Sequence, residues 1–143
     1  MAAAITIAET GHLVLGTLHT NTAAGTITRL VDAFPPTKQE IIRTNLSMSL
    51  LAIISQQLIP NNKDGRTLAA EILINTQAIK SLIRENNIHQ IDSYIQSGLK
   101  DGMIRMDNFI LNLYNENIIS KEQALNHAIN PSEISQKLNG PNI

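Results

Sequence analysis

The sequence of 143 residues contains no cysteine and no tryptophan, and only 3% of its residues are aromatic. The absence of cysteine excludes disulfides, iron–sulfur clusters, thiolate zinc sites and cysteine nucleophiles. With so few aromatic side chains, a stacking platform for single-stranded nucleic acid has almost nothing to be built from. Eleven basic residues against twelve acidic ones give a net charge of −1, which argues against a reader of phosphate backbones. We therefore expect no nucleic-acid partner.

Long hydrophobic runs are missing as well. The most apolar stretch, residues 46–59, is about four residues short of a membrane span and contains several serine and glutamine residues. The N-terminal residues have no basic region, and their apolar run stops at Glu9, so they do not resemble a signal peptide. Apolar residues make up 43% of the chain and charged residues 16%, which is typical of a folded domain. We expect a cytoplasmic protein without a transmembrane segment.

The first half of the chain predicts a mixture of helices and strands. Residues 2–9 fit a helix that ends at Gly11. Residues 12–19 are rich in β-formers and apolar on both faces through Leu15, which predicts a buried strand of a parallel sheet. A helix is expected over residues 23–34, with the polar residues 20–22 as cap candidates. A second helix should start with a capping box at residues 37–40, and its apolar stripe runs to Ile53 and Ile54. Residues 61–65 then predict a hairpin turn, between a possible short strand at 57–60 and an alternating strand at 66–75.

The second half is expected to be helical throughout. Apolar residues recur at spacings of three and four in several segments, which predict helices over residues 77–85, 89–96, 106–115 and 121–129. Ser120 with Gln123 forms a second capping box, and Pro131 ends the last strong helix. We therefore divide the chain near residue 75, into a strand-containing part, 1–75, and a helical part, 76–143.

The two early histidines are the first candidates for chemistry. If residues 12–19 form one strand, its rise of ~3.3 Å per residue puts His12 and His19 roughly 23 Å apart on opposite faces, so they cannot share a metal ion. His19, Thr20 and Asn21 follow the end of the predicted strand, where open α/β sheets bind their ligands. There a histidine could donate a hydrogen bond to a phosphate or orient a water molecule. The equally weighted alternative is that His19 only caps the next helix.

The sequence contains no other motif that predicts nucleotide or metal chemistry. Gly11 and Gly16 have the spacing of two phosphate-loop glycines, but the lysine and hydroxyl residue that must follow are missing. No apolar strand ends in a tandem acidic pair that could hold magnesium, and we expect no metal site. His89 and His127 are interpreted as structural or exposed. Glu71 is expected to be a buried partner of Arg66 or Arg84, without a chemical role.

Five segments together resemble one known family. Residues 10–21 (TGHLVLGTLHTN) are similar to the His box of the secretion and type IV pilus ATPases, which are RecA-like hexameric motors. Residues 27–36 and 46–60 resemble the twitching-motility branch, the pilus retraction ATPases, and residues 65–73 continue the match. Residues 78–85 (AIKSLIRE) resemble the retraction motif of that branch. The resemblance runs from about residue 2 to residue 131, with Lys80 in place of an arginine and Arg105 in place of a small polar residue.

This resemblance implies a fold class and a truncation. The fold is expected to be α/β: the C-terminal half of a RecA-like P-loop NTPase core, with a partial sheet flanked by helices, followed by a small helical subdomain. In the family, the His box lies downstream of the phosphate loop and the Walker B acid, neither of which occurs in this sequence. We therefore expect the chain alone to be catalytically inactive and to need no cofactor. The complete family protein uses ATP and Mg²⁺.

The resemblance also assigns roles to residues. It implies that His19 senses the terminal phosphate, that His12 assists it, and that Gly11, Thr20 and Asn21 lie near the nucleotide. The motif expected to transmit the movement for retraction consists of Ala78, Ile79, Lys80, Leu82, Ile83, Arg84 and Glu85.

The same family likeness implies the partners. The complete protein should form a homo-hexamer that works with an inner-membrane platform protein at the base of a pilus, on the cytoplasmic side. Two alternatives stay open. The chain could be a non-catalytic module that binds full-length motor subunits, or it could belong to a type II secretion or pilus-assembly ATPase. The second alternative is disfavoured because those relatives usually carry a four-cysteine zinc insertion.

Overall fold

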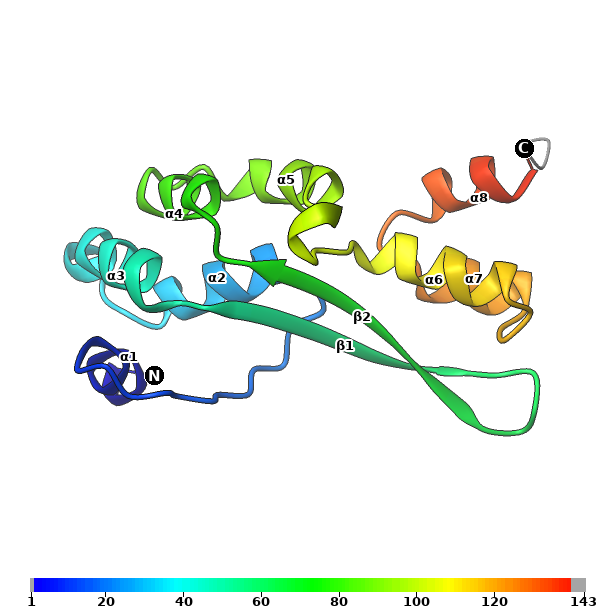
Figure 1. The fold of residues 1–143 in the computed structure, drawn as a ribbon, viewed down its shortest axis with the longest axis horizontal. Helices are drawn as coiled ribbons and strands as arrows, with labels where there is room; N and C mark the ends of the chain where they lie inside the picture. Colours follow the sequence, from blue (N-terminus) through cyan, green and yellow to red (C-terminus); the bar gives the residue numbers. More distant parts are fainter. Residues whose placement is uncertain (1, 140–143) are drawn as a thin grey trace.

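A computed structural model describes residues 2–139, which form a long two-stranded hairpin with helices packed along it (Figure 1). The helices α2 to α5 gather near one end of the hairpin and α6 to α8 near the other, while α1 packs on α3. Two short 3₁₀ turns, Ile88–Gln90 and Leu99–Asp101, flank α5. The elements are α1 (Ala2–Glu9), α2 (Ala23–Asp32), α3 (Pro36–Ser49), β1 (Ala52–Pro60), β2 (Arg66–Ile74), α4 (Gln77–Arg84), α5 (Ile91–Ser97), α6 (Met106–Asn115), α7 (Lys121–His127) and α8 (Pro131–Asn139).

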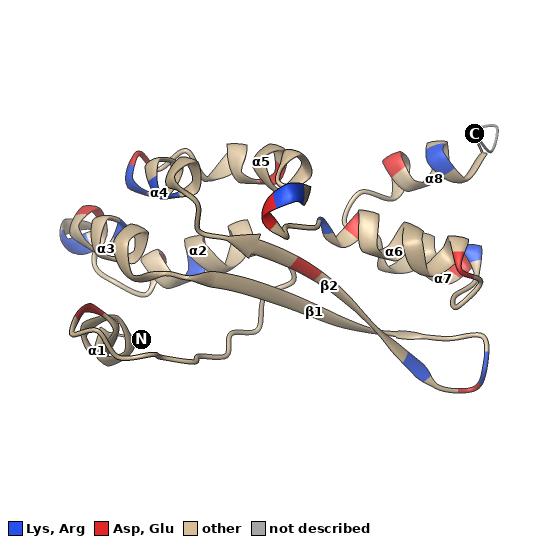
Figure 2. Ribbon diagram, viewed as in Figure 1, with Lys and Arg blue, Asp and Glu red and all other residues tan. Residues whose placement is uncertain are grey.

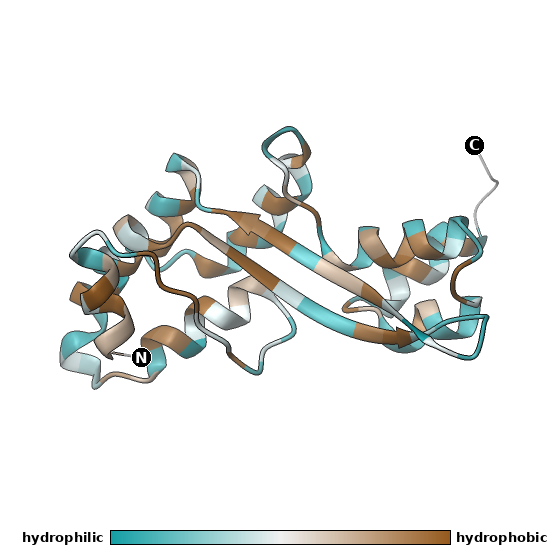
Figure 3. Cartoon of the chain, turned by 60° about the horizontal axis from the view of Figure 1, so that its bottom comes forward, coloured by the Kyte–Doolittle hydropathy of each residue, from teal (hydrophilic) through white to brown (hydrophobic). Residues whose placement is uncertain are grey.

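The hairpin is antiparallel and covered by helices on one face. Its register pairs Leu58 with Leu68 and Ile54 with Ile72. Because strand side chains alternate, the other set of β1 and β2 residues points into the helices and is largely buried. The opposite face leaves Ile54, Leu58 and Leu68 exposed. Hydrophobic residues thus run along both strands (Figure 3), and charged residues lie mostly on the helices and at the hairpin tip (Figure 2).

Two clusters of buried apolar side chains hold the helices on the hairpin. The first joins α2, α4 and α5 to the end of the hairpin where β1 starts and β2 ends. The second joins α6, α7 and α8 to Ile59 and Ala69 in the half of the hairpin nearer the turn. Each cluster draws on residues from both sides of residue 75, so the division of the chain there stays a prediction. Within residues 2–139, no helix has the length and apolar character needed to cross a membrane.

The α/β fold class and most predicted elements are confirmed. The hairpin turn lies at residues 61–65, where the side-chain oxygen of Asn61 accepts hydrogen bonds from the amides of Lys63 and Gly65. Gly11 ends α1 with a φ of +88°, a conformation that glycine adopts without a steric penalty. Two predicted caps also form: Thr22 accepts from the amide of Gly25, and Ser120 from the amide of Gln123.

The buried strand expected over residues 12–19 is not formed. These residues run as an extended connection beneath β1, and among residues 2–139 their backbone makes no hydrogen bond to another backbone group (Figure 1). Leu13 and Leu15 are 74% and 91% exposed. A strand needs a neighbour to satisfy its amides and carbonyls, and the described sheet contains only β1 and β2.

The boundary between α3 and β1 was also predicted wrongly. The helix ends at Ser49, because the side-chain amide of Asn75 donates to the carbonyl oxygens of Ser47 and Leu50 at 3.0 and 2.7 Å. Ile53 and Ile54 therefore lie on a strand and not on a helical stripe. The β-branched pair suits that strand, and cross-strand pairing with β2 overrides the helical periodicity.

Two helix starts differ from the prediction. The capping box at residues 37–40 does not form, because α3 already begins at Pro36 and no side chain caps it. Pro131 follows the end of α7 but also opens a further helix, α8, which the sequence analysis did not predict. Proline is well suited to the first helical position, where its missing amide hydrogen would have no intrahelical partner.

Candidate functional site

The His box residues lie in the extended connection between α1 and α2. His12 sits directly after the end of α1, where its Nδ1 is 2.9 Å from the hydroxyl of Thr10. Both His12 and His19 are exposed. No group of three His, Asp or Glu side chains that could hold a metal ion occurs within residues 2–139.

The far end of this connection is fastened to α2. Arg29 donates through Nη1 to the carbonyl oxygen of His19 at 3.2 Å, and the hydroxyls of Thr20 and Thr26 are 2.6 Å apart. Thr22, and not His19, caps the helix. The imidazole of His19 and the amide of Asn21 consequently remain exposed, on a backbone that α2 holds in place.

A cleft of about 490 Å³ opens beside the connection. Residues 14–20 form one wall, and α1, α2, the end of α3 and β1 form the others. None of its lining residues carries an acid, a base or a histidine ring, although Thr17, Thr20 and Ser55 contribute hydroxyls. The cleft can therefore offer apolar surface and hydrogen bonds, but no titratable group for acid–base chemistry.

Glu71 is a buried acidic residue that contacts the start of α2, next to this site. Its Oε1 accepts from the backbone amide of Ala23 at 2.7 Å, and its Oε2 accepts from that of Met106 at 3.3 Å. Burial raises the pKa of the Glu71 carboxyl, and these two hydrogen bonds oppose the rise. The expected pairing with Arg66 or Arg84 is wrong. In the structure Glu71 shares the inward face of β2 with the buried Ala69 and Leu73, where a carboxylate must find donors.

The α4 segment divides into a buried and an exposed set of residues. Ile79, Leu82 and Ile83 are buried and belong to the first apolar cluster. Arg84 is exposed and donates to the hydroxyl of Ser81, within its own helix, at 3.1 Å. The remaining motif residues turn toward solvent: Ala78 and Glu85 are exposed, and Lys80 is partly so. The charged face is therefore free to contact another molecule.

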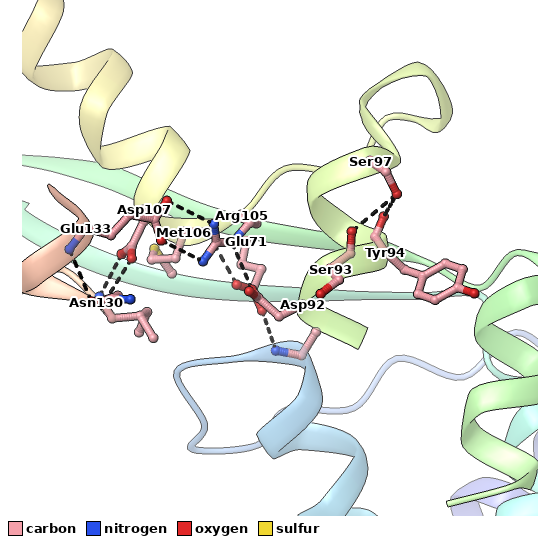
Figure 4. A network of polar contacts seen from close by, with 12 residues as sticks. Glu71, Asp92, Ser93, Tyr94, Ser97, Arg105, Met106, Asp107, Asn130 and Glu133 are labelled. Carbon is pink, nitrogen blue, oxygen red and sulfur yellow. Dashed lines mark hydrogen bonds and ion pairs between the residues drawn. The ribbon is translucent and has the colours of Figure 1, made fainter. Parts of the chain in front are cut away.

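A second polar cluster surrounds the start of α6 (Figure 4). Arg105 pairs through Nε with Asp92 at 2.9 Å and through Nη1 with Glu133 at 3.3 Å, which joins α5 to α8. Although burial opposes the charged guanidinium, its bonds to the two carboxylates outweigh that effect and raise the pKa of Arg105. Buried Asp107 accepts from the amides of Ile129 and Asn130 at 2.7 and 2.9 Å, and so fixes the entry to α8. Sequence reasoning missed this cluster because its partners are far apart in the chain.

Comparison with known proteins identifies the class of this chain. The family described as Type II/IV secretion system protein matches residues 1–112, and the chain belongs to that family. Within the family it is similar to proteins of pilus retraction. It is 47% identical over 133 residues to the twitching motility protein of Neisseria gonorrhoeae, covering 92% of this chain and 36% of that protein.

Two further relatives agree with this placement. The type IV pilus retraction ATPase PilT of Pseudomonas aeruginosa is 49% identical over 121 residues, which cover 85% of this chain and 35% of the relative. A crystal structure of the pilus retraction motor PilT with bound ADP superimposes with a TM-score of 0.85 at 44% identity, covering 94% of this chain and 38% of the other. The chain thus spans about a third of the length of these relatives.

Proposed function

We propose that this chain acts as part of a hexameric pilus retraction ATPase, which couples ATP hydrolysis to type IV pilus disassembly and twitching motility. The observation that carries the proposal is similarity to retraction motors over most of the chain, in sequence and in fold. The segment corresponds, on this reading, to the C-terminal part of the motor, which holds the His box and the retraction motif.

His19 is proposed to sense the terminal phosphate of ATP, the substrate, with assistance from His12. The proposal is supported by the exposed imidazole of His19 and by the bonds that tie its backbone to α2. Gly11, Thr20 and Asn21 are proposed to lie near the nucleotide. A histidine donor held in place can respond to the presence or loss of a phosphate with little reorganisation of its own.

The isolated chain is proposed not to hydrolyse ATP. Phosphoryl transfer depends on positioned phosphate ligands and a metal ion, and the sequence contains no phosphate-loop lysine. The described residues contain no cluster of acidic or histidine side chains suited to Mg²⁺, so none of them is proposed to bind it. In the motor, the nucleotide would be bound mainly by parts of the protein outside this chain.

The α4 motif is proposed to transmit the movement that retracts the pilus. Its apolar side packs into the first apolar cluster, which ties the helix to the hairpin and to α2. The exposed Arg84 and the partly exposed Lys80 would contact the next moving part of the motor. The proposed partners are identical subunits and an inner-membrane platform protein, at the cytoplasmic base of the pilus.

The test is a hybrid motor in which this chain replaces the matching segment of the P. aeruginosa retraction ATPase. We expect His19→Ala to lower kcat by about 100-fold or more, within the range of a lost catalytic hydrogen bond, while nucleotide binding changes less than about 3-fold. His89→Ala is the matched control, because His89 is an exposed histidine outside the His box. Equal losses of binding and turnover would refute the sensor role. Magnesium-dependent hydrolysis by the isolated chain, abolished by His19→Ala, would refute its inactivity.

A second candidate function is favoured by the exposed apolar face of the hairpin. Ile54, Leu58 and Leu68 present hydrophobic surface that another protein chain could cover. The chain could then act as a non-catalytic module that binds full-length motor subunits and blocks their ring. Co-purification with the P. aeruginosa ATPase, inhibition of its hydrolysis, and loss of both with Leu58→Asp would support this function. Normal hydrolysis in the presence of excess chain would exclude it.

A further inference from the structure

Glu71 connects two helices that are remote from each other in sequence. It lies in the middle of β2 and is only 4% exposed. One carboxylate oxygen accepts from the first residue of α2 and the other from the first residue of α6. The first amides of a helix have no partner within it, and the helix dipole favours a negative charge there. One side chain therefore satisfies two helix N-termini together.

The α2 end of this bridge leads directly to the His box. Ala23, which donates to Glu71, follows Thr22. The hydroxyl of Thr20 contacts Thr26 in the first turn of the same helix, and the carbonyl of His19 accepts from Arg29 in its last turn. The α6 end is set next to Arg105 and its ion pairs. A cavity of about 140 Å³ borders Glu71, Thr22 and Arg105, so these groups meet at one junction.

We propose that Glu71 is a positioning residue, whose carboxylate fixes the segment 19–23 relative to the start of α6. The contacts form a continuous path from the ion pairs of Arg105, through the α6 amide and Glu71, to the α2 amide and His19. On this proposal a displacement of α6 moves the backbone of His19, and with it the imidazole. The path is a property of the fold and is independent of the proposed function. Only its importance for catalysis rests on that function.

The test uses the 143-residue chain without nucleotide. Glu71→Gln keeps the size of the side chain but replaces one acceptor oxygen with a donor, and Glu71→Asp keeps the charge but shortens the reach. Glu122→Gln is the control, because Glu122 is an exposed residue in the first turn of α7. We measure amide hydrogen exchange at Ala23 and Met106 by NMR, together with the ring resonances of His19.

We expect exchange at Ala23 or Met106 to accelerate at least about 5-fold in each Glu71 variant, with the His19 ring resonances shifted and the exchange of α7 amides unchanged. A purely structural contact would change the amides without moving the His19 ring. Unshifted His19 resonances in a folded variant therefore overturn the proposal, and so does unchanged exchange at both amides.

A further variant leaves Glu71 intact, in case neither substitution folds. Arg105→Lys disturbs the residue that precedes α6, and it should shift the His19 ring resonances if the path exists. Unmoved resonances overturn the proposal in this case too. The outcome is distinguishable from a failure of the proposed function, because no nucleotide is present. If His19→Ala leaves ATP turnover of the hybrid motor unchanged, the sensor role fails while the Glu71 path stands.

Discussion

Substituting Arg105 by alanine removes the ion pairs that join α5, α6 and α8. The guanidinium donates to Asp92 at 2.9 Å and, through both terminal nitrogens, to the two oxygens of Glu133 at 3.3 and 3.4 Å. Its side chain is only 10% exposed, whereas those of Asp92 and Glu133 are 54% and 26% exposed. The stabilisation therefore comes mainly from the pair with Glu133.

The expected loss follows from these exposures. Exposed pairs such as the one with Asp92 contribute roughly 0.5 kcal/mol, because water screens them. Breaking a fully buried pair costs about 3–5 kcal/mol, but Glu133 keeps its bond to Lys137 and partial access to water, which lowers the cost. We expect Arg105→Ala to reduce the free energy of unfolding by about 2 kcal/mol, or to lower Tm by about 6 °C for a chain of this size.

The assay is urea unfolding followed by circular dichroism, in a double-mutant cycle. We expect a coupling energy of about 1 kcal/mol between Arg105→Ala and Glu133→Gln, and about 0.5 kcal/mol between Arg105→Ala and Asp92→Asn. Arg84→Ala is the control, since Arg84 is exposed and its side chain donates to Ser81 within its own helix. A coupling energy with Glu133 below about 0.3 kcal/mol would refute the reasoning, because the pair would then contribute nothing measurable.

Three further predictions concern pH, packing and the α4 helix. Hydrogen bonds from Lys137 and Arg105 lower the pKa of Glu133, so its ionised form stabilises the fold at neutral pH. The stability difference between wild type and Glu133→Gln should therefore shrink as pH falls from about 5 to 3. Urea unfolding checks this, and a constant difference would contradict it. In Gly98→Ala the new Cβ would lie 2.7 Å from Sδ of Met103. We expect this substitution to reduce the free energy of unfolding by about 1–2 kcal/mol and to lower Tm accordingly. An unchanged Tm would show that the site has room for the methyl group. In urea unfolding, Ile83→Ala should reduce the free energy of unfolding by about 3 kcal/mol, because Ile83 is buried. Arg84→Ala should reduce it by less than about 0.5 kcal/mol, because Arg84 is exposed. Similar losses in the two variants would be inconsistent with the packing of α4.

The features that the sequence predicted correctly depend on short-range chemistry. The polar residues 20–22 predicted a cap that Thr22 provides, the capping-box pattern predicted the cap at Ser120, and the turn residues at 61–65 marked the hairpin. The exposed and buried sides of α4 likewise followed from the spacing of its apolar residues. In each case the residues that decide the structure lie within a few positions of one another.

The features that it predicted wrongly depend on distant neighbours. Residues 12–19 are apolar enough for a buried strand, but strand formation requires a pairing partner that a local pattern does not reveal. Residues 50–54 fit a helix and a strand equally well, and the register with β2 decides between them. In the candidate site, the two hydrogen-bond partners of Glu71 lie 48 and 35 positions away in the sequence. A local pattern of residues therefore cannot identify them.

The most direct test of the proposed function is twitching motility with the hybrid motor, expressed in P. aeruginosa that lacks its own retraction ATPase. We predict that the hybrid restores twitching and that His19→Ala abolishes it at equal protein level, whereas His89→Ala has no effect. A hybrid that assembles and hydrolyses ATP but leaves the cells unable to twitch would contradict the proposal that this chain belongs to a pilus retraction motor. Undiminished twitching with His19→Ala would contradict the role given to the His box.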